Sequence, residues 1–314
     1  MTRMARALSL GPGPAVLAFD VGGTDIKSAL VDSAGSFSQV RRTPTTRGVD
    51  AARAITASLA ELASPLVAAA ASPVAAAGVS VPGLVDEAAG IGVLSANLGW
   101  RDAPIRDLAT RALGLPVAFG HDVRAAGVAE QAFGAARDAR SAVVVVIGTG
   151  IAGAIILDGR PYAGQGFAGE IGHSLAVPDG ELCPCGARGC LETVASAHSI
   201  ARRYTAETGE QVRGAREVLV AALGGDAAAA RIWDSAVDAL AQSLARLVAL
   251  LAPEVIVIGG GLSGAGDALF RPLGTRLDEL LSFHARPRLV RAELGDDAGL
   301  LGTAIAARRL AGAP

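Results

Sequence analysis

Short runs of apolar residues that end at glycine turns dominate the pattern along the chain. Residues 15–20 (AVLAFD) lead into VGGTD and then into a second apolar run at residues 26–32. A strand, a glycine turn and a second strand are typical of a β-hairpin. Residues 142–159 (AVVVVIGTGIAGAIILDG) repeat this order, and in both copies the second run ends at an aspartate, Asp32 or Asp158. The repeat predicts an internal duplication with a period of roughly half the chain.

The remaining pattern alternates between strand and helix spacing. The further elements we predict are strands at 37–42 and near 77–83, a helix at 49–70, a helix-rich segment at about 191–251, a strand entering a glycine turn at 254–266, and a final amphipathic helix at 299–312. We place a domain boundary near residue 120. The prediction is a small N-terminal α/β domain at 1–120, joined by the last helix, and a larger α/β domain at 121–298.

Composition and charge narrow the class of protein. The chain has 314 residues, enough for one large domain or two ordinary ones, and 51% of them are hydrophobic but only 4% aromatic. We therefore expect a core of small aliphatic side chains. The net charge of −2 argues against a nucleic-acid partner, because such binding needs clustered lysine and arginine.

One uncharged stretch, residues 64–85, is long enough to be considered as a membrane span. Pro65, Pro73 and Pro82 interrupt it, so a helix end, a turn and a strand explain it better. Residues 1–20 contain two arginines but no long apolar segment before GPGP, which is a poor match to a signal peptide. We expect a cytoplasmic chain with no membrane partner. Three cysteines cannot all pair with one another, which weakens a disulfide interpretation.

The glycine turns are candidate phosphate-binding loops. A glycine turn lets backbone N–H groups approach phosphate oxygens, and a threonine adds a hydroxyl donor. A carboxylate at the strand end suits a hydrated Mg²⁺, and a lysine suits phosphate. Taken singly, each turn is equally compatible with a simple tight turn, and the Walker-type pattern is absent. The candidate cofactor-binding residues are Asp20, Gly22, Gly23, Thr24, Lys27, Gly148, Thr149, Gly150, Gly260 and Gly261.

The chain resembles a known family over residues from about 15 to the end. FDVGGTDIKSALVD resembles the first phosphate loop of the sugar kinase/actin/Hsp70 superfamily, and IGTGIAGAIILDG resembles the second. The segment GEIGH…CPCGARGCLE resembles the most specific signature of the ROK family, which groups sugar kinases and sugar-responsive repressors. The resemblance implies an actin-like ATPase (ribonuclease H-like) α/β fold, with two duplicated domains and a cleft between them. It also implies ATP and Mg²⁺ as cofactors, a small-molecule sugar substrate, and a homodimer or homotetramer.

All three cysteines lie close together, ten or more residues after a histidine. His173, Cys183, Cys185 and Cys190 have the composition of a structural zinc site. The alternative is three buried free cysteines, since free cysteine packs well in cores. The prolines, glycines and charges around them make a poor core segment, so composition, context and family resemblance together predict Zn²⁺. His198 and His284 lack such a setting, and we expect ordinary surface or helix positions for them.

The resemblance also assigns roles to single residues. In ROK kinases the residues that match Glu170, His173 and Glu192 bind sugar hydroxyls, and Asn97 matches a motif near the sugar pocket. The loop at Gly83 is a further candidate for sugar contact, although a Pro-Gly turn without a function is as plausible.

Asp122 matches the catalytic aspartate of the ROK family. From the residues alone a plain N-cap would be the preferred interpretation, since Asp122 stands where a helix begins. The family usually has Asn-Asp followed shortly by another Asn, whereas this chain has His121, Asp122, Val and Arg124. His121 is therefore expected either to reshape the pocket around the sugar hydroxyls or to turn away from it.

We predict an ATP-dependent kinase that phosphorylates a hexose hydroxyl, glucose or a related hexose, at O6. Another hexose or an amino sugar is the first alternative, and polyphosphate is not excluded as donor. A ROK repressor is the second, but only fourteen residues precede AVLAFD, too few for a helix-turn-helix domain. A sugar sensor without catalysis is the third, and the presence of Asp20, Asp122 and the glycine turns argues against it.

Overall fold

The computed structural model describes residues 9–46 and 50–312, so the first eight residues, part of the segment considered as a signal peptide, lie outside the described residues. The strands are β1 (Ala15–Val21), β2 (Asp25–Val31), β3 (Phe37–Pro44), β4 (Val74–Val81), β5 (Leu84–Asp86), β6 (Ile91–Ser95), β7 (Trp100–Ala103), β8 (Val117–His121), β9 (Ala142–Ile147), β10 (Ile151–Leu157), β11 (Arg160–Tyr162), β12 (Val255–Gly259) and β13 (Arg288–Arg291). The helices are α2 (Ala51–Ala68), α3 (Ile105–Leu113), α4 (Asp122–Phe133), α5 (Leu191–Ala195), α6 (Ala197–Thr208), α7 (Ala215–Leu223), α8 (Ala227–Leu251), α9 (Asp267–Leu280) and α10 (Ala298–Leu310). Short 3₁₀ turns are η1 (Gly164–Gly166), η2 (Ile171–His173), η3 (Gly261–Ala265) and η4 (Gly295–Asp297).

The predicted duplication is confirmed by the topology of the two five-stranded sheets. One sheet has the order β3-β2-β1-β4-β8 and the other the order β11-β10-β9-β12-β13. In each sheet the central strand, β1 or β9, pairs antiparallel with the next strand in sequence and parallel with a later one. Both halves therefore follow one plan: a hairpin comes first, and a crossover then adds the parallel strands on the other side.

The chain divides into two compact units, each built around one of these sheets. Of the described residues, the first unit contains those up to Gly134, the segment Ala163–Ala168 and those from Leu294 onward. The second contains Ala135–Tyr162 and Gly169–Glu293. The division differs from the boundary expected near residue 120, because α4 belongs with the first sheet. The last helix, α10, lies in the first unit.

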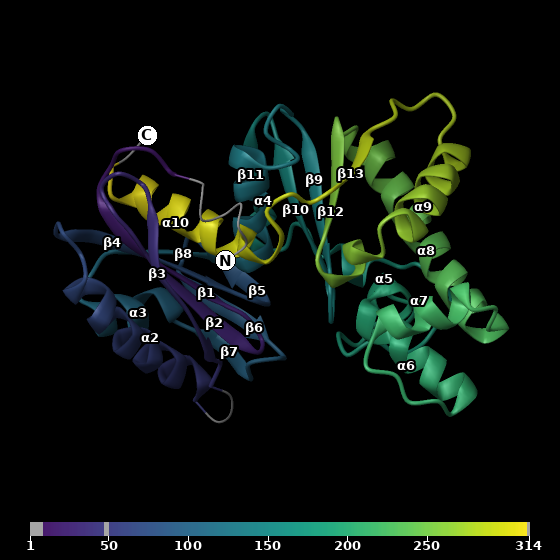
Figure 1. The fold of residues 1–314 in the computed structure, drawn as a ribbon, viewed down its shortest axis with the longest axis horizontal. Helices are drawn as coiled ribbons and strands as arrows, with labels where there is room; N and C mark the ends of the chain where they lie inside the picture. Colours follow the sequence, from purple (N-terminus) through teal and green to yellow (C-terminus); the bar gives the residue numbers. More distant parts are fainter. Residues whose placement is uncertain (1–8, 47–49, 313–314) are drawn as a thin grey trace. The chain divides into compact units, whose positions relative to one another are not determined.

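In the first unit the sheet is covered on both faces, as Figure 1 shows for α2 and α3 on one side and α10 on the other. Leu17 and Phe19 of β1 point into the cluster with α2 and α3, whereas Val16 and Ala18 point into the cluster with α10. A strand that is buried on both faces reads as a continuous apolar run, which is why the sequence signal of AVLAFD was strong.

Small residues let α10 approach its neighbours closely. A Cβ added to Gly302 would lie 1.8 Å from the carbonyl oxygen of Ala125 in α4, and one added to Gly78 in β4 would lie 2.3 Å from the carbonyl oxygen of Thr303. Neither glycine can take a side chain without moving the helix. This packing holds α4, and the residues at its start, against the first sheet.

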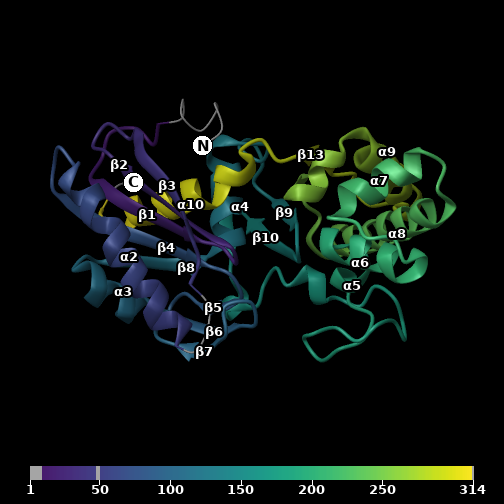
Figure 2. The same ribbon diagram turned by 60° about the horizontal axis from the view of Figure 1, so that its bottom comes forward.

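In the second unit the helices α6, α7, α8 and α9 gather on one side of the sheet (Figure 2). Val143, Val145 and Ile147 of β9 are buried against this layer, together with Trp233 and Leu240 of α8. The helix-rich segment predicted for 191–251 is thus confirmed as α5 to α8.

The uncharged stretch at 64–85 forms the end of α2, a turn and β4, as expected. No helix in the described ranges is both long and apolar enough to cross a membrane.

Candidate active site

The first glycine turn joins β1 to β2 and is closed by its own backbone. The Gly22 amide donates to the carbonyl of Asp25 at 2.8 Å, and the hydroxyl of Thr45 donates to the carbonyl of Gly22 at 2.8 Å. The turn is therefore held in one shape from both sides. Asp20 stands at its entrance and Lys27 at its exit, paired across the hairpin.

The Asp20 carboxylate lies at the bottom of this turn and is largely buried. Ser80 donates to its Oδ1 at 3.1 Å, Lys27 Nζ lies 3.7 Å from its Oδ2, and a Cβ added to Gly299 would lie 2.6 Å from Oδ2. Burial raises the pKa of Asp20 to about 6, while Lys27 lowers it and the charge of Asp122 raises it. A buried carboxylate whose pKa is raised in this way gains from a bound cation, and oxygen is the donor that Mg²⁺ prefers. The residues present thus fit the ion.

Asp122 is the first residue of α4, but it is not the cap. His121 occupies the N-cap position, and its Nδ1 accepts the backbone N–H of Arg124 at 3.3 Å. The Asp122 Oδ1 accepts the N–H of Val123 at 2.7 Å. The plain capping role weighed for Asp122 is therefore taken by its neighbour, which leaves the carboxylate available for another task.

The electrostatic setting of Asp122 suits a proton acceptor. Its side chain is 26% exposed, and burial raises its pKa to about 6, opposed by the hydrogen bond from Val123 and by the charges of Arg124 and Lys27. The charge of Lys27 lowers the pKa of both Asp20 and Asp122, and the charge of Asp122 raises that of Asp20, so these three predicted residues of the first unit lie within electrostatic reach of one another. A base with a pKa just below neutral pH is ionised under working conditions and still accepts a proton readily.

His121 is buried rather than exposed to solvent. Its side chain is 5% exposed, and its Nε2 lies 3.5 Å from Asp122 Oδ1. Position 121 therefore bears on the candidate base as well as on the sugar contact proposed from the family resemblance.

We expect His121→Asn to shift kcat/KM toward glucose relative to other hexoses. Asparagine caps a helix as well as histidine does, so the start of α4 should be kept while the ring beside Asp122 is removed. The measurement is kcat/KM for a set of hexoses with both proteins, and melting temperature is the control for folding. An unchanged sugar ranking, in an enzyme that already uses glucose efficiently, contradicts this role for position 121.

The second glycine turn, in the second unit, is in direct contact with Glu192. The Glu192 Oε2 accepts the N–H of Ile151 at 2.7 Å, and a Cβ added to Gly150 would lie 2.5 Å from the same oxygen. The Gly148 carbonyl accepts the N–H of Ala197 at the start of α6. A candidate phosphate loop and a candidate sugar-binding carboxylate thus form one cluster, although 41 residues separate Ile151 from Glu192.

We expect Gly150→Ala to raise the KM for the sugar, because the new methyl group displaces the Glu192 carboxylate. Gly148→Ala is the matched variant, since a Cβ at Gly148 meets nothing within 4 Å. It should leave the sugar KM unchanged, whatever it does to the KM for ATP. Equal sugar KM values for Gly150→Ala and wild type would show that Glu192 does not depend on this contact. Steady-state kinetics with each substrate varied separately provides the measurement.

The segment 170–192, which we call the cysteine loop, runs into the start of α5. It contains the four predicted zinc ligands. The Cys183 Sγ lies 3.6 Å from His173 Nδ1, the Cys185 Sγ lies 3.6 Å from the Cys190 Sγ, and the four ligand atoms all lie within 4.8 Å of one another. With Zn–S bonds of about 2.3 Å, a tetrahedral site places its sulfurs roughly 3.8 Å apart. The geometry therefore fits zinc, with Nδ1 of His173 as the nitrogen ligand.

The loop geometry also explains its glycines. Gly186 and Gly189 have φ angles of +94° and +72°, and a Cβ on Gly189 would lie 1.8 Å from the carbonyl oxygen of Val177. Cys190 is the N-cap residue of α5, whose second residue is Glu192. Anything that fixes Cys190 consequently fixes the position of Glu192. Glu170 precedes η2, and its carbonyl accepts the N–H of His173.

The remaining predicted site residues are Asn97, Gly83, Gly260 and Gly261. Asn97 is exposed in the turn between β6 and β7 of the first unit. Gly83 has φ +101°, and a Cβ there would lie 2.3 Å from the carbonyl of Leu94, so packing alone requires glycine. In the second unit, a Cβ on Gly260 would lie 2.4 Å from the carbonyl oxygen of Ile147, whereas Gly261 is open.

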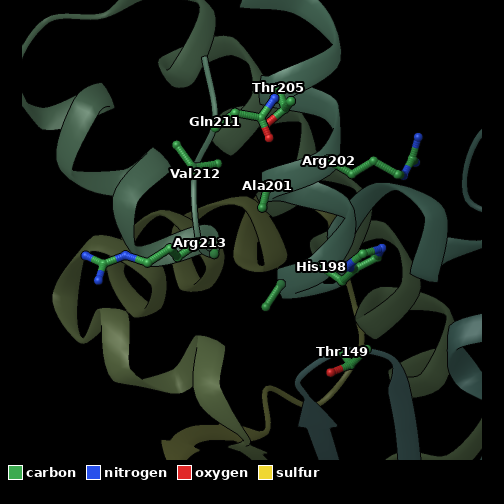
Figure 3. A pocket seen from close by; sticks show the side chains of 10 residues that line it. Thr149, His198, Ala201, Arg202, Thr205, Gln211, Val212 and Arg213 are labelled. Atoms are coloured by element: carbon green, nitrogen blue, oxygen red, sulfur yellow. The ribbon is translucent and has the colours of Figure 1, made fainter. Parts of the chain in front are cut away.

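A cavity beside the second glycine turn was not anticipated from the sequence. This cavity, which we call the α6 cavity, measures about 450 Å³ and lies within the second unit. Thr149 is at one end, and α6 and the loop before α7 surround it (Figure 3). Its lining residues are Thr149, Ala197, His198, Ala201, Arg202, Thr205, Gln211, Val212, Arg213 and Gly214. The volume is within the range of small-molecule sites. His198, expected to be an ordinary helix residue, is one of its walls.

The ROK family model matches residues 16–309. A glucokinase of Halalkalibacterium halodurans is 35% identical over 307 residues, which cover 90% of this chain and 92% of that protein. An N-acetylmannosamine kinase of Yersinia pseudotuberculosis is 35% identical over 297 residues, which cover 93% and 98%. The structure of a ROK family glucokinase from Streptomyces griseus, in complex with glucose and AMPPNP, is 28% identical with a TM-score of 0.80 and covers 94% of this chain and 99% of that one. With its duplicated sheets, its cysteine loop and these matches, the chain belongs to the ROK family.

Proposed function

We propose that the chain is an ATP-dependent sugar kinase that transfers a phosphoryl group to a hexose hydroxyl, glucose or a related hexose, at O6. The observation that carries this proposal is the partly buried Asp122 carboxylate at the start of α4, with a pKa of about 6 and within electrostatic reach of Lys27 at the first glycine turn. The relatives support it, because they include a glucokinase and an N-acetylmannosamine kinase.

Phosphoryl transfer depends mainly on positioning, charge neutralisation and a group that takes the hydroxyl proton. Asp122 would accept the proton of the attacking sugar hydroxyl at one of its carboxylate oxygens. Lys27, at the exit of the first turn, would neutralise phosphate charge. Asp20 would hold Mg²⁺, which supplies further charge neutralisation at the phosphates when bound.

The sugar would be bound by groups that the cysteine loop positions. Carboxylates accept hydrogen bonds from hydroxyl groups, and Glu170 and Glu192 stand at the two ends of the loop. His173 would direct one ring nitrogen to zinc and the other to the sugar, so the metal would fix both the imidazole and Cys190 next to α5. Asn97 and Gly83 are proposed as further contacts from the family resemblance.

The nucleotide would be bound by the glycine turns and the α6 cavity. Backbone N–H groups of the turn at Gly148, Thr149 and Gly150 suit phosphate oxygens. The neighbouring cavity has apolar walls at Ala201 and Val212, which suit a nucleoside base, while its two arginines, Arg202 and Arg213, are ion-paired with Glu181 and Glu217. We propose it as the nucleoside site, with the turn at Gly260 as a third contact. The AMPPNP complex of the Streptomyces griseus relative supports ATP as donor.

The assay that tests this function measures ADP release across a panel of sugars with Mg·ATP. We expect sugar-dependent ADP release with glucose or a related hexose. An amino sugar as the preferred substrate would select the alternative that the Yersinia relative suggests. Sugar binding without ADP release would show a sensor instead. The homodimer or homotetramer stays a prediction, which light scattering of the purified protein measures.

A further inference from the structure

Arg124 is a buried cation in an unfavourable place. It is the third residue of α4, and its side chain is only 5% exposed. The N-terminus of a helix carries partial positive charge, which disfavours a cation there. Burial of a charge costs further free energy unless the group is paired and hydrogen-bonded. A charged arginine at this position is therefore disfavoured both by the helix N-terminus and by burial. Its contacts show which interactions offset these two costs.

Glu87, on the turn that follows β5, provides the first compensation. Its Oε1 accepts the Nε–H of Arg124 at 2.8 Å and also the backbone N–H of His121 at 3.1 Å. One carboxylate oxygen thus holds the residue before Asp122 and a residue after it. The start of α4 is fixed on both sides of the candidate base.

The segment 163–168 provides the second compensation. The Arg124 Nη1 lies 3.4 Å from the carbonyl oxygen of Gly166 and 3.3 Å from that of Ala168. A Cβ on Gly166 would lie 2.2 Å from the carbonyl oxygen of Val85, so this segment is itself packed against β5. The guanidinium thereby joins three parts of the first unit: the start of α4, the end of β5 and the segment 163–168.

From this geometry we infer that Arg124 is a positioning residue for the transfer, because it fixes the Asp122 carboxylate through the start of α4. The inference rests on the proposed function and adds a residue to it. Its charge also acts on Asp122 directly. The charged and titratable groups that face Asp122 are Lys27, Asp20, His121 and Arg124 itself. Arg124 and Lys27 lower the pKa of Asp122 against the effect of burial.

Two variants separate the effect of the planar guanidinium, with its fixed N–H donors, from the effect of its positive charge. Arg124→Met removes both, and we expect kcat to fall by about 10²-fold, the cost of misplacing a reacting group by roughly 1 Å. The acidic limb of the kcat profile should move to higher pH, and the KM for the sugar should stay close to wild type. Arg124→Lys keeps the charge but not the planar fork. It should lose less activity, and its acidic limb should stay in place.

Arg106→Met is the matched control. Arg106 donates to the backbone carbonyls of Glu87, Ala88 and Ala89, so it holds the same turn but does not touch α4. Its kcat and acidic limb should equal those of wild type, even if its melting temperature falls.

If Arg124→Met does not fold, Arg124→Lys decides: a reduced kcat with an unchanged acidic limb supports the inference, and wild-type kcat overturns it. Wild-type kcat and pH profile in a folded Arg124→Met, with only a lower melting temperature, would show a purely structural arginine. Failure of the wild-type enzyme to phosphorylate any sugar would instead refute the proposed function.

Discussion

Asp122→Asn is expected to lower kcat by about 10²–10⁴-fold, the usual contribution of a general base. Asparagine keeps the shape of the side chain but does not accept the proton of the sugar hydroxyl. Sugar binding should be mostly kept, since the change affects the transition state more than the bound substrate. Steady-state kcat, and sugar affinity from calorimetry, measure the two effects separately. Turnover near that of wild type would rule out Asp122 as the base.

The pH profile of the wild-type enzyme supplies a second test of Asp122. Burial raises its pKa from 3.8 to about 6, so activity that requires the carboxylate should fall below about pH 6. Ionisation of Asp122 changes the free energy of unfolding in the opposite direction to ionisation of a salt-bridged aspartate. The folded chain holds the proton more tightly than the unfolded chain, so the ionised group destabilises the fold as pH rises from about 4 through 6. Asp122→Asn should therefore be at least as stable as wild type at pH 7, which thermal denaturation measures.

Cys185→Ser is expected to abolish the binding of about one zinc per chain and to lower the melting temperature. Structural zinc contributes folding free energy directly, about 10–16 kcal/mol in isolated zinc-finger peptides. Cys185 is exposed while Cys183 and Cys190 are buried, so serine at 185 removes a ligand without disturbing the core. The KM for the sugar should rise as well, because Cys190 and Glu192 lose their anchor. Elemental analysis of the purified protein measures the metal.

Asp179→Asn is the control for the zinc experiment. Asp179 lies in the same loop with φ +57°, a conformation that asparagine tolerates, and it is not among the four ligands. Its zinc content should equal that of wild type. Full zinc and full stability in Cys185→Ser would contradict the site.

The parts of the fold that the sequence predicts are those with strong local signals. The hairpins at 15–32 and 142–159 are buried apolar runs with a glycine turn, and their similarity revealed the duplication. The domain boundary was less accessible, because it depends on contacts between distant residues. α4 joins the first unit through the contact between Ala125 and Gly302, and no local pattern near residue 120 reports a contact made 177 positions later.

For the candidate site too, the features with a local sequence signal could be predicted and those that depend on distant contacts could not. The cysteine cluster and the glycine turns were visible as residue types at close spacing. The contact of Glu192 with Gly150 was not, since it brings together segments about forty residues apart, and neither was the bond between Arg124 and Glu87. The N-cap role of His121 was missed for another reason. Aspartate is a more common N-cap than histidine, so the pattern favoured Asp122. The α6 cavity has no motif, because helix packing creates it.

The most direct test of the proposed function identifies the product. The wild-type protein is incubated with Mg·ATP and the best sugar of the panel, and ³¹P NMR follows the phosphates. We expect a hexose 6-phosphate that forms in an amount equal to the ADP, at a rate that Asp122→Asn strongly reduces. ADP that forms without any sugar phosphate, or a sugar phosphate that forms equally fast with Asp122→Asn, would contradict it.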